Sequence, residues 1–180
     1  MADRYLHFSA QVNDDTANRF CMALAVAANQ GVSRLNISIN SSGGNVVAGI
    51  GMYNMLRAMP YPVVTHNIGN IDSITNAVFL GGTERYASPS STFMFHGVAF
   101  PPSGETLDEK VLRAKLDTIL ADQKRISNII ASHTRLTAAD GMRLFREQKT
   151  RPAAWALDKG LIHEIRDHIV PSGADFQFIA

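Results

Sequence analysis

Along the chain, segments in which hydrophobic and polar residues strictly alternate take turns with segments in which hydrophobic residues recur every three or four positions. Strict alternation predicts a strand at residues 5–10, and apolar positions three or four apart then predict a helix at 17–30, which begins after the polar residues 14–16 and ends at Gly31. The same exchange of strand and helix continues. Its segments are expected at 35–40 (strand), 45–59 (helix), 62–68 (strand), 74–80 (helix) and 92–95 (strand). This order is typical of parallel strands joined by crossover helices, the α/β class.

A long amphipathic pattern follows a polar loop at 100–106 that contains proline and glycine. It predicts a helix from about residue 107 to 133, which would be about 40 Å long. Because this length exceeds the width of a small domain, part of the helix should project. The alternative is a helix that breaks near Ala121 and Asp122 and wraps onto its own domain. A shorter helix is expected from 137 to about 148.

Two polar side chains fall at the ends of predicted strands. Ser73 lies in the turn between the strand that ends near residue 68 and the helix that begins at 74, where a hydroxyl can be held out beside free backbone N–H groups. His96 directly follows the strand at 92–95. Because functional turns gather at the carboxyl ends of parallel strands, these residues suggest a Ser-His pair. Each also has a plain structural reading, as a helix cap or as a surface histidine.

A glycine pair completes the pattern. Gly43 and Gly44 follow the strand at 35–40, and they can bring bare N–H groups close to a reacting oxygen or simply form a tight turn. The ordered segments INSSGG, GNIDS and FMFH, together with ALDKGLI at 156–162, resemble the Clp protease proteolytic subunit (ClpP) family. The resemblance extends from Tyr5 to about Ile165.

The resemblance implies an architecture. It is an α/β, ClpP/crotonase-like fold of repeated β-β-α/βαβ units with mostly parallel strands. One domain would cover residues 1–180, with a head at 1–100 and 137–180. The projecting helix, at about 101–136, would be a handle that interdigitates between stacked rings. The expected assembly is a homo-oligomeric ring, with two stacked heptamers as one arrangement.

The resemblance also implies a mechanism. Ser73 would attack a peptide carbonyl while His96 takes its proton, and the N–H groups of Gly44 and Ile74 would form the oxyanion hole. A polypeptide substrate would lie extended between two segments. These substrate-binding segments lie at Gly43 and after His96, at Gly97.

Four departures from the family pattern affect this reading. Ser42 replaces the family's proline in the glycine loop, which should loosen that turn without removing the N–H groups. Asp72 replaces a small residue before the serine. It is expected to act as a helix cap or a surface acid, or else to turn inward and alter the charge of the site. The third triad position aligns with Gln148 in place of an aspartate, and Glu147 is the alternative. Compared with the family, the chain is also expected to lack the segment that lines the axial pore, because it begins close to the first strand. We therefore do not favour docking of an ATPase or adaptor in trans.

Composition excludes several classes of protein. The chain has 180 residues, a net charge of +1 and 18% charged residues, so it has no basic field for nucleic acid. No apolar run is long enough for a membrane span, and we expect a cytoplasmic protein. The histidines lack a metal-ligand spacing and there is no phosphate-binding loop, so no cofactor and no metal are expected. The low charged fraction favours burial against other subunits.

Two alternatives remain open beside the serine peptidase. Asp72 and Gln148 would suit a catalytically weak or inactive ring subunit that acts as a scaffold. The loop N–H groups would also suit a crotonase-fold protein that binds acyl thioesters, in which Ser73 and His96 would be coincidental.

Overall fold

The computed structural model describes residues 2–100, 104 and 106–180. Its helices are α1 (Asp14–Asn29), α2 (Val46–Ala58), α3 (Thr75–Leu80), α4 (Glu109–His133), α5 (Ala138–Glu147) and α6 (Ala153–Asp158). Its strands are β1 (Asp3–Phe8), β2 (Arg34–Ser41), β3 (Val63–Asp72), β4 (Glu84–Ala87), β5 (Thr92–Met94), β6 (Thr150–Pro152), β7 (Glu164–Ile165) and β8 (Asp175–Ile179). Part of the polar loop predicted at 100–106 lies outside the described residues.

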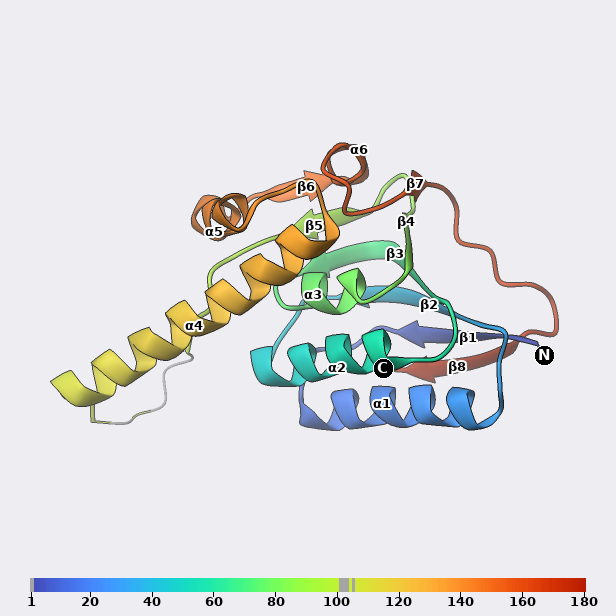
Figure 1. Ribbon diagram of the computed structural model, residues 1–180, viewed down its shortest axis with the longest axis horizontal. Helices are drawn as coiled ribbons and strands as arrows, with labels where there is room; N and C mark the ends of the chain where they lie inside the picture. The colour runs from blue at the N-terminus through green and yellow to red at the C-terminus, as the bar shows by residue number, and fades with distance from the viewer. Residues whose placement is uncertain (1, 101–103, 105) are drawn as a thin grey trace.

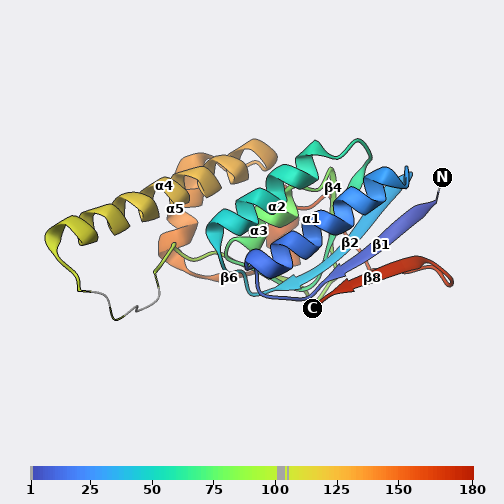
Figure 2. The same ribbon diagram turned by 90° about the horizontal axis from the view of Figure 1, so that it is seen from below.

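The strands form one sheet in the order β6-β5-β3-β2-β1-β8, and β4 and β7 branch from β3. Every pairing is parallel except that of β5 with β6. The predicted α/β fold with mostly parallel strands is therefore confirmed. Helices α1 and α2 lie side by side on one face of the sheet, and α4 extends away from it (Figures 1 and 2).

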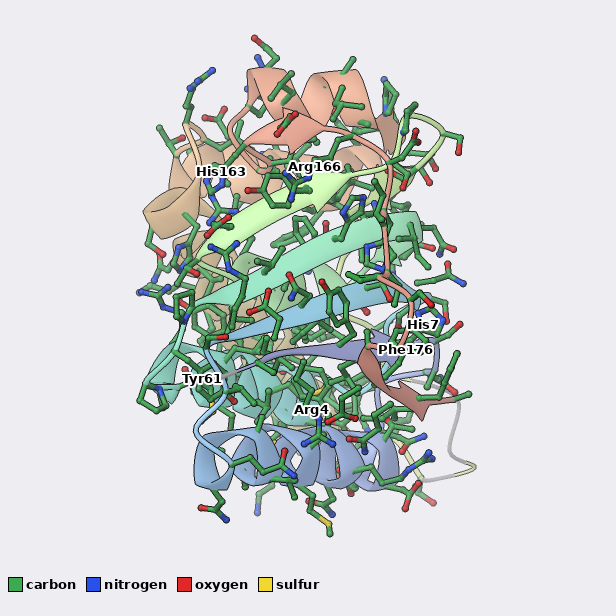
Figure 3. All side chains as sticks on the ribbon, turned by 90° about the vertical axis from the view of Figure 1, so that its right-hand side faces the viewer. Arg4, His7, Tyr61, His163, Arg166 and Phe176 are labelled. Carbon is green, nitrogen blue, oxygen red and sulfur yellow. The ribbon has the colours of Figure 1, made fainter. Side chains whose placement is uncertain are left out.

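The core lies between this sheet and its helices. Alternate strand residues such as Phe8, Ile37 and Ile39 are fully buried, and they pack with Phe20 of α1 and Met52 of α2. The opposite face of the sheet has polar side chains. The segment between β7 and β8 runs across the strands on this side, as Figure 3 shows near Arg166 and His7. The two faces of the sheet thus differ in chemistry.

Several element boundaries differ from the sequence prediction. Helix α1 begins three residues earlier than residue 17, because the Asn13 side chain accepts a hydrogen bond from the Thr16 N–H (2.9 Å) and the Thr16 hydroxyl accepts one from the Asn13 N–H (3.0 Å). Strand β3 continues to Asp72, beyond the predicted end at residue 68. Its first half pairs with β4 and its last three residues pair with β5, which satisfies their backbone groups.

The long helix α4 is continuous, as the favoured prediction had it, and the alternative of a break near Ala121 and Asp122 is wrong. Its second half packs into the core through Ile126 and Ile130. Its first half carries exposed leucines, at Leu112, Leu116 and Leu120. No helix among the described residues is long and apolar enough to cross a membrane.

Candidate active site

Ser73 occupies a strained turn at the end of β3. Its φ is +56°, in the left-handed region that residues other than glycine seldom adopt and that costs about 1–3 kcal/mol. Its N–H donates to the Met94 carbonyl of β5 at 2.9 Å, so the turn is anchored to the neighbouring strand. Ser73 does not cap α3: the N-cap is Ile74, which makes no side-chain capping bond.

Asn76 stabilises this turn from inside α3. Its side-chain amide is 1% exposed and donates to the carbonyl oxygens of Ser73 (3.1 Å), Met94 (2.9 Å) and Ile71 (3.3 Å). One buried side chain therefore holds the ends of β3 and β5 in register around the serine. Asn76 was not among the residues predicted from sequence, although an amide inside the apolar run at 74–80 is a signal for it.

The glycine pair packs directly against the serine turn. A Cβ on Gly43 would lie 2.6 Å from the Ser73 Cβ, and one on Gly44 would lie 2.1 Å from the Val12 carbonyl oxygen. Their φ values are +91° and +148°. The backbone groups of Gly43 are both used, because its carbonyl accepts from the Val12 N–H and its N–H donates to the Ser41 hydroxyl. Only glycine fits this close approach at both positions.

His96 has a defined tautomer. Its Nδ1 lies 2.8 Å from the Gly97 carbonyl oxygen. Because a carbonyl can only accept, Nδ1 must carry the proton and donate it, which leaves Nε2 free as an acceptor. The backbone at Gly97 thus orients the ring. No hydrogen bond joins His96 to Ser73 in the described part of the chain.

Both residues line one small cavity of about 80 Å³. Gly44 and Ile74 line it too, and apolar residues complete the walls: Val46, Val98, Ala99, Ile126 and Phe145. Within the described residues, the N–H groups of Gly44 and Ile74 make no hydrogen bond, so they are unused donors beside the serine. The structure therefore brings together four of the residues predicted from sequence.

Gln148 and Glu147 are the two candidates for the third triad position. Gln148 is exposed and ends α5 in a left-handed conformation (φ +49°), where its N–H donates to the Leu144 carbonyl. Glu147 pairs with Arg151 and, at 3.6 Å, with Arg143. Neither forms a hydrogen bond with His96 among the described residues, so the assignment of this position stays a prediction.

Asp72 lies close enough to His96 for the two side chains to interact electrostatically. It ends β3, is half-buried and accepts a hydrogen bond from the Asn70 amide at 2.6 Å. Burial raises the pKa of its carboxyl group, whereas that hydrogen bond and the charge that His96 can carry act to lower the pKa. It caps no helix, unlike one of its predicted roles.

A hydroxyl in a strained strand-to-helix turn, an imidazole with a free Nε2 and two unused N–H donors are the parts that acyl transfer requires. The described residues contain no cluster of histidine, cysteine and acidic residues able to hold a metal ion. The fold belongs to the α/β class, and the arrangement of these groups is similar to that of serine hydrolases.

Comparison with known proteins identifies the family. The family model for Clp protease matches residues 1–168, and the chain belongs to this family. Two relatives are ATP-dependent Clp protease proteolytic subunit 1 of Leifsonia xyli (29% identity; 93% of this chain and 85% of the relative) and subunit 2 of Corynebacterium glutamicum (25%; 94% and 83%). The resemblance inferred from the motifs is confirmed.

A solved structure shows the same fold. It is a point mutant of ClpP1 from Listeria monocytogenes, with a TM-score of 0.78 and 20% identity over 92% of this chain and 91% of that one. At this identity the match is evidence for the fold alone.

Proposed function

We propose that this protein is a serine peptidase subunit that hydrolyses peptide bonds through an acyl-enzyme. The observation that carries the proposal is the shared cavity of Ser73, His96 and the unused N–H groups of Gly44 and Ile74. Membership of the Clp protease family and the names of the relatives, which are proteolytic subunits, support the peptide as substrate.

In this mechanism, the Ser73 hydroxyl attacks the carbonyl carbon while Nε2 of His96 takes its proton. The negative oxygen of the tetrahedral intermediate receives hydrogen bonds from the N–H groups of Gly44 and Ile74. The intermediate collapses, His96 returns the proton to the leaving amine, and a water molecule then hydrolyses the ester by the same steps in reverse. Substrate binding at Gly43 and Gly97 remains a prediction. The backbone groups of Gly43 are already hydrogen-bonded within the protein.

In this proposal the Gly97 carbonyl performs one of the two roles of a triad acid, which is to orient the histidine. It fixes the tautomer and orientation of His96 through the 2.8 Å hydrogen bond. A neutral carbonyl stabilises the imidazolium less than a carboxylate does, so turnover should be slower than in an enzyme with a complete triad. Asp72 supplies negative charge nearby without a hydrogen bond to the ring.

Hydrolysis of fluorogenic peptides tests the proposal. The wild type should cleave at least one member of a varied panel, and Ser73→Ala and His96→Ala should each reduce the rate to background. Ser42→Ala is the matched control, because Ser42 is exposed in the same glycine loop and should be dispensable. Wild-type rates in Ser73→Ala would refute the mechanism.

We also propose that the chain assembles into a homo-oligomeric ring through α4, the predicted handle. The leucines at 112, 116 and 120 are each about half exposed on a helix that extends from the sheet. Such an apolar row is stabilised when a second copy covers it. Light scattering should therefore give a mass several times the 19.6 kDa of one chain; a mass of one chain would contradict the ring.

An inactive scaffold subunit is the second candidate. The observations in its favour are that no carboxylate contacts His96 through a hydrogen bond, and that Ser73 and His96 are not hydrogen-bonded to each other in the described residues. Assembly with no hydrolysis by either the wild type or Gln148→Asp would support it. A crotonase-like role predicts instead that coenzyme A binds at the glycine loop.

A further inference from the structure

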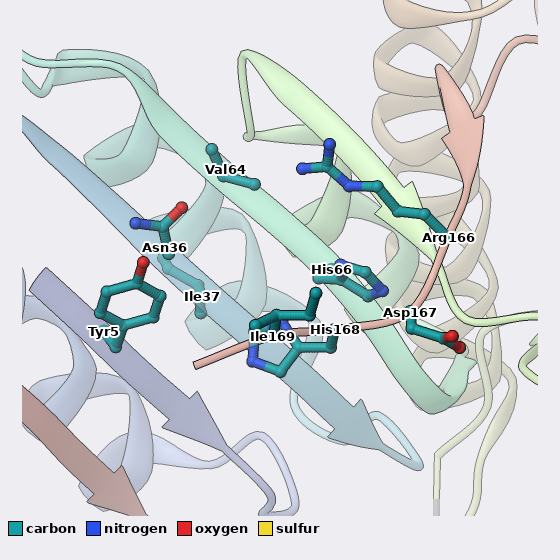
Figure 4. Close-up of a pocket in the computed structure, with 9 residues that line it drawn as sticks. All are labelled: Tyr5, Asn36, Ile37, Val64, His66, Arg166, Asp167, His168 and Ile169. Atoms are coloured by element: carbon teal, nitrogen blue, oxygen red, sulfur yellow. The ribbon is translucent and has the colours of Figure 1, made fainter. Parts of the chain in front are cut away.

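A second cavity of the described structure lies away from the proposed active site. It has a volume of about 450 Å³ and lies on the polar face of the sheet, and none of its residues lines the cavity of Ser73. Figure 4 shows its lining on β1, β2 and β3, with the segment after β7 crossing them. Its polar and charged lining residues are Tyr5, Asn36, His66, Arg166, Asp167 and His168.

Two buried side-chain nitrogens of residues that line this cavity are unpaired in the described part of the chain: the amide donor of Asn36 and a ring nitrogen of His168, which donates when it carries a proton. The side-chain nitrogen Nδ2 of Asn36 and the ring nitrogen Nε2 of His168 are enclosed, yet neither makes a hydrogen bond in the described structure. Buried polar groups are nearly always paired, and an unpaired group loses its hydration without compensation. Two such groups on one cavity indicate that a ligand with acceptor oxygens completes them.

The surrounding charges favour an acceptor that is anionic. Arg166 stacks on Tyr86, 3.4 Å from the ring centroid, and brings its positive charge to the cavity. The exposed carboxylate of Asp167 offsets this charge at the rim. The net charge of the cavity therefore depends on its imidazoles, which are neutral or positive according to pH.

His168 is surrounded by groups that couple to its protonation. Its ring lies 5.0 Å from that of His66, and burial, His7 and Arg166 all lower its pKa. The titratable or charged groups around it are His66 on β3, His7 and Tyr5 on β1, and Arg166 and Asp167 on its own segment. A bound anion would stabilise the imidazolium and raise that pKa, so binding should take up a proton.

We propose that this cavity binds the carboxylate or phosphate group of a small anionic molecule, held by Asn36 and His168 beside Arg166. An oxyanion offers several acceptor oxygens to the two unpaired donors and draws on the nearby guanidinium. The site is separate from the proposed peptidase chemistry, so it can be tested whether or not the protein hydrolyses peptides.

Calorimetric titration with sulfate, whose own charge is constant between pH 6 and pH 8, is the test. We expect affinity about tenfold higher at pH 6, together with proton uptake measured in buffers of different ionisation enthalpy. Asn36→Ala and His168→Phe should each weaken binding about tenfold. The control is Asn54→Ala, since Asn54 is exposed on α2.

Competition identifies the chemical source of the anion. Stronger displacement of sulfate by succinate than by inorganic phosphate would assign a carboxylate ligand, and the reverse order would assign a phosphate. The proposal is overturned if sulfate does not bind at millimolar concentration, or if both variants bind it as the wild type does while melting at the wild-type temperature. Using two variants guards against misfolding of one of them.

Discussion

Replacing Gly44 by alanine should disable the proposed oxyanion hole with the serine and histidine left in place. The new Cβ would lie 2.1 Å from the Val12 carbonyl oxygen, which already accepts a hydrogen bond from the Asn45 N–H at 2.7 Å. The contact is more than 1 Å too short, so the loop must move by about that distance. The φ of +148° adds backbone strain.

This displacement should lower kcat much more than it lowers the stability of the fold. Removing one oxyanion donor lowers kcat by about 100- to 1000-fold, and a misplacement of about 1 Å has an effect of similar size. Gly44→Ala should therefore show a kcat lower by this factor, with KM little changed. Steady-state peptide hydrolysis measures both constants, and thermal melting checks that the variant is folded.

The matched control is Gly51→Ala in the exposed face of α2, where a Cβ meets no atom within 4 Å. Alanine there should raise the free energy of unfolding by about 0.5–1 kcal/mol and leave kcat unchanged. A Gly44→Ala enzyme with kcat within a few-fold of wild type would show that this N–H does not stabilise the transition state.

Three further predictions follow from particular contacts. Glu147→Ala and Gln148→Asp should leave hydrolysis unchanged, because a backbone carbonyl already holds the proposed base; a rise with Gln148→Asp would place the triad acid there. Leu116→Asp should reduce the mass measured by light scattering or make the protein insoluble, whereas Lys124→Asp on the same helix should not. Burial lowers the pKa of His66 to about 4. Because His66 takes up a proton near pH 6.5 in the unfolded chain but not in the folded one, the free energy of unfolding should fall by up to about 3 kcal/mol as the pH drops from 6.5 to 4. The melting temperature of His66→Gln should decline less steeply over this pH range.

Hydrophobic periodicity predicted the main strands and helices because each is long enough to repeat its pattern. Strands β6 and β7 have three and two residues, too few for any period, and β8 joins the sheet edge only through its pairing with β1. The convergence of Ser73, His96 and Gly44 followed from parallel strand ends that meet at one edge.

Other parts of the site depend on tertiary contacts that no local pattern encodes. The hydrogen bonds from Asn76 to the carbonyl oxygens of Met94 and Ile71 form only when β3 and β5 pair. Histidines 7, 66 and 168 are scattered along the sequence, yet the sheet and its crossing segment bring them to one face. Sequence spacing gave no sign of that cluster.

Labelling with a fluorophosphonate probe tests the central claim most directly, because it reports an activated serine without requiring the right peptide. The account predicts one adduct per chain, mapped by mass spectrometry to Ser73, lost in Ser73→Ala, strongly slowed in His96→Ala and retained in Ser42→Ala. An adduct on another serine, or labelling that persists unchanged in Ser73→Ala, would contradict the account.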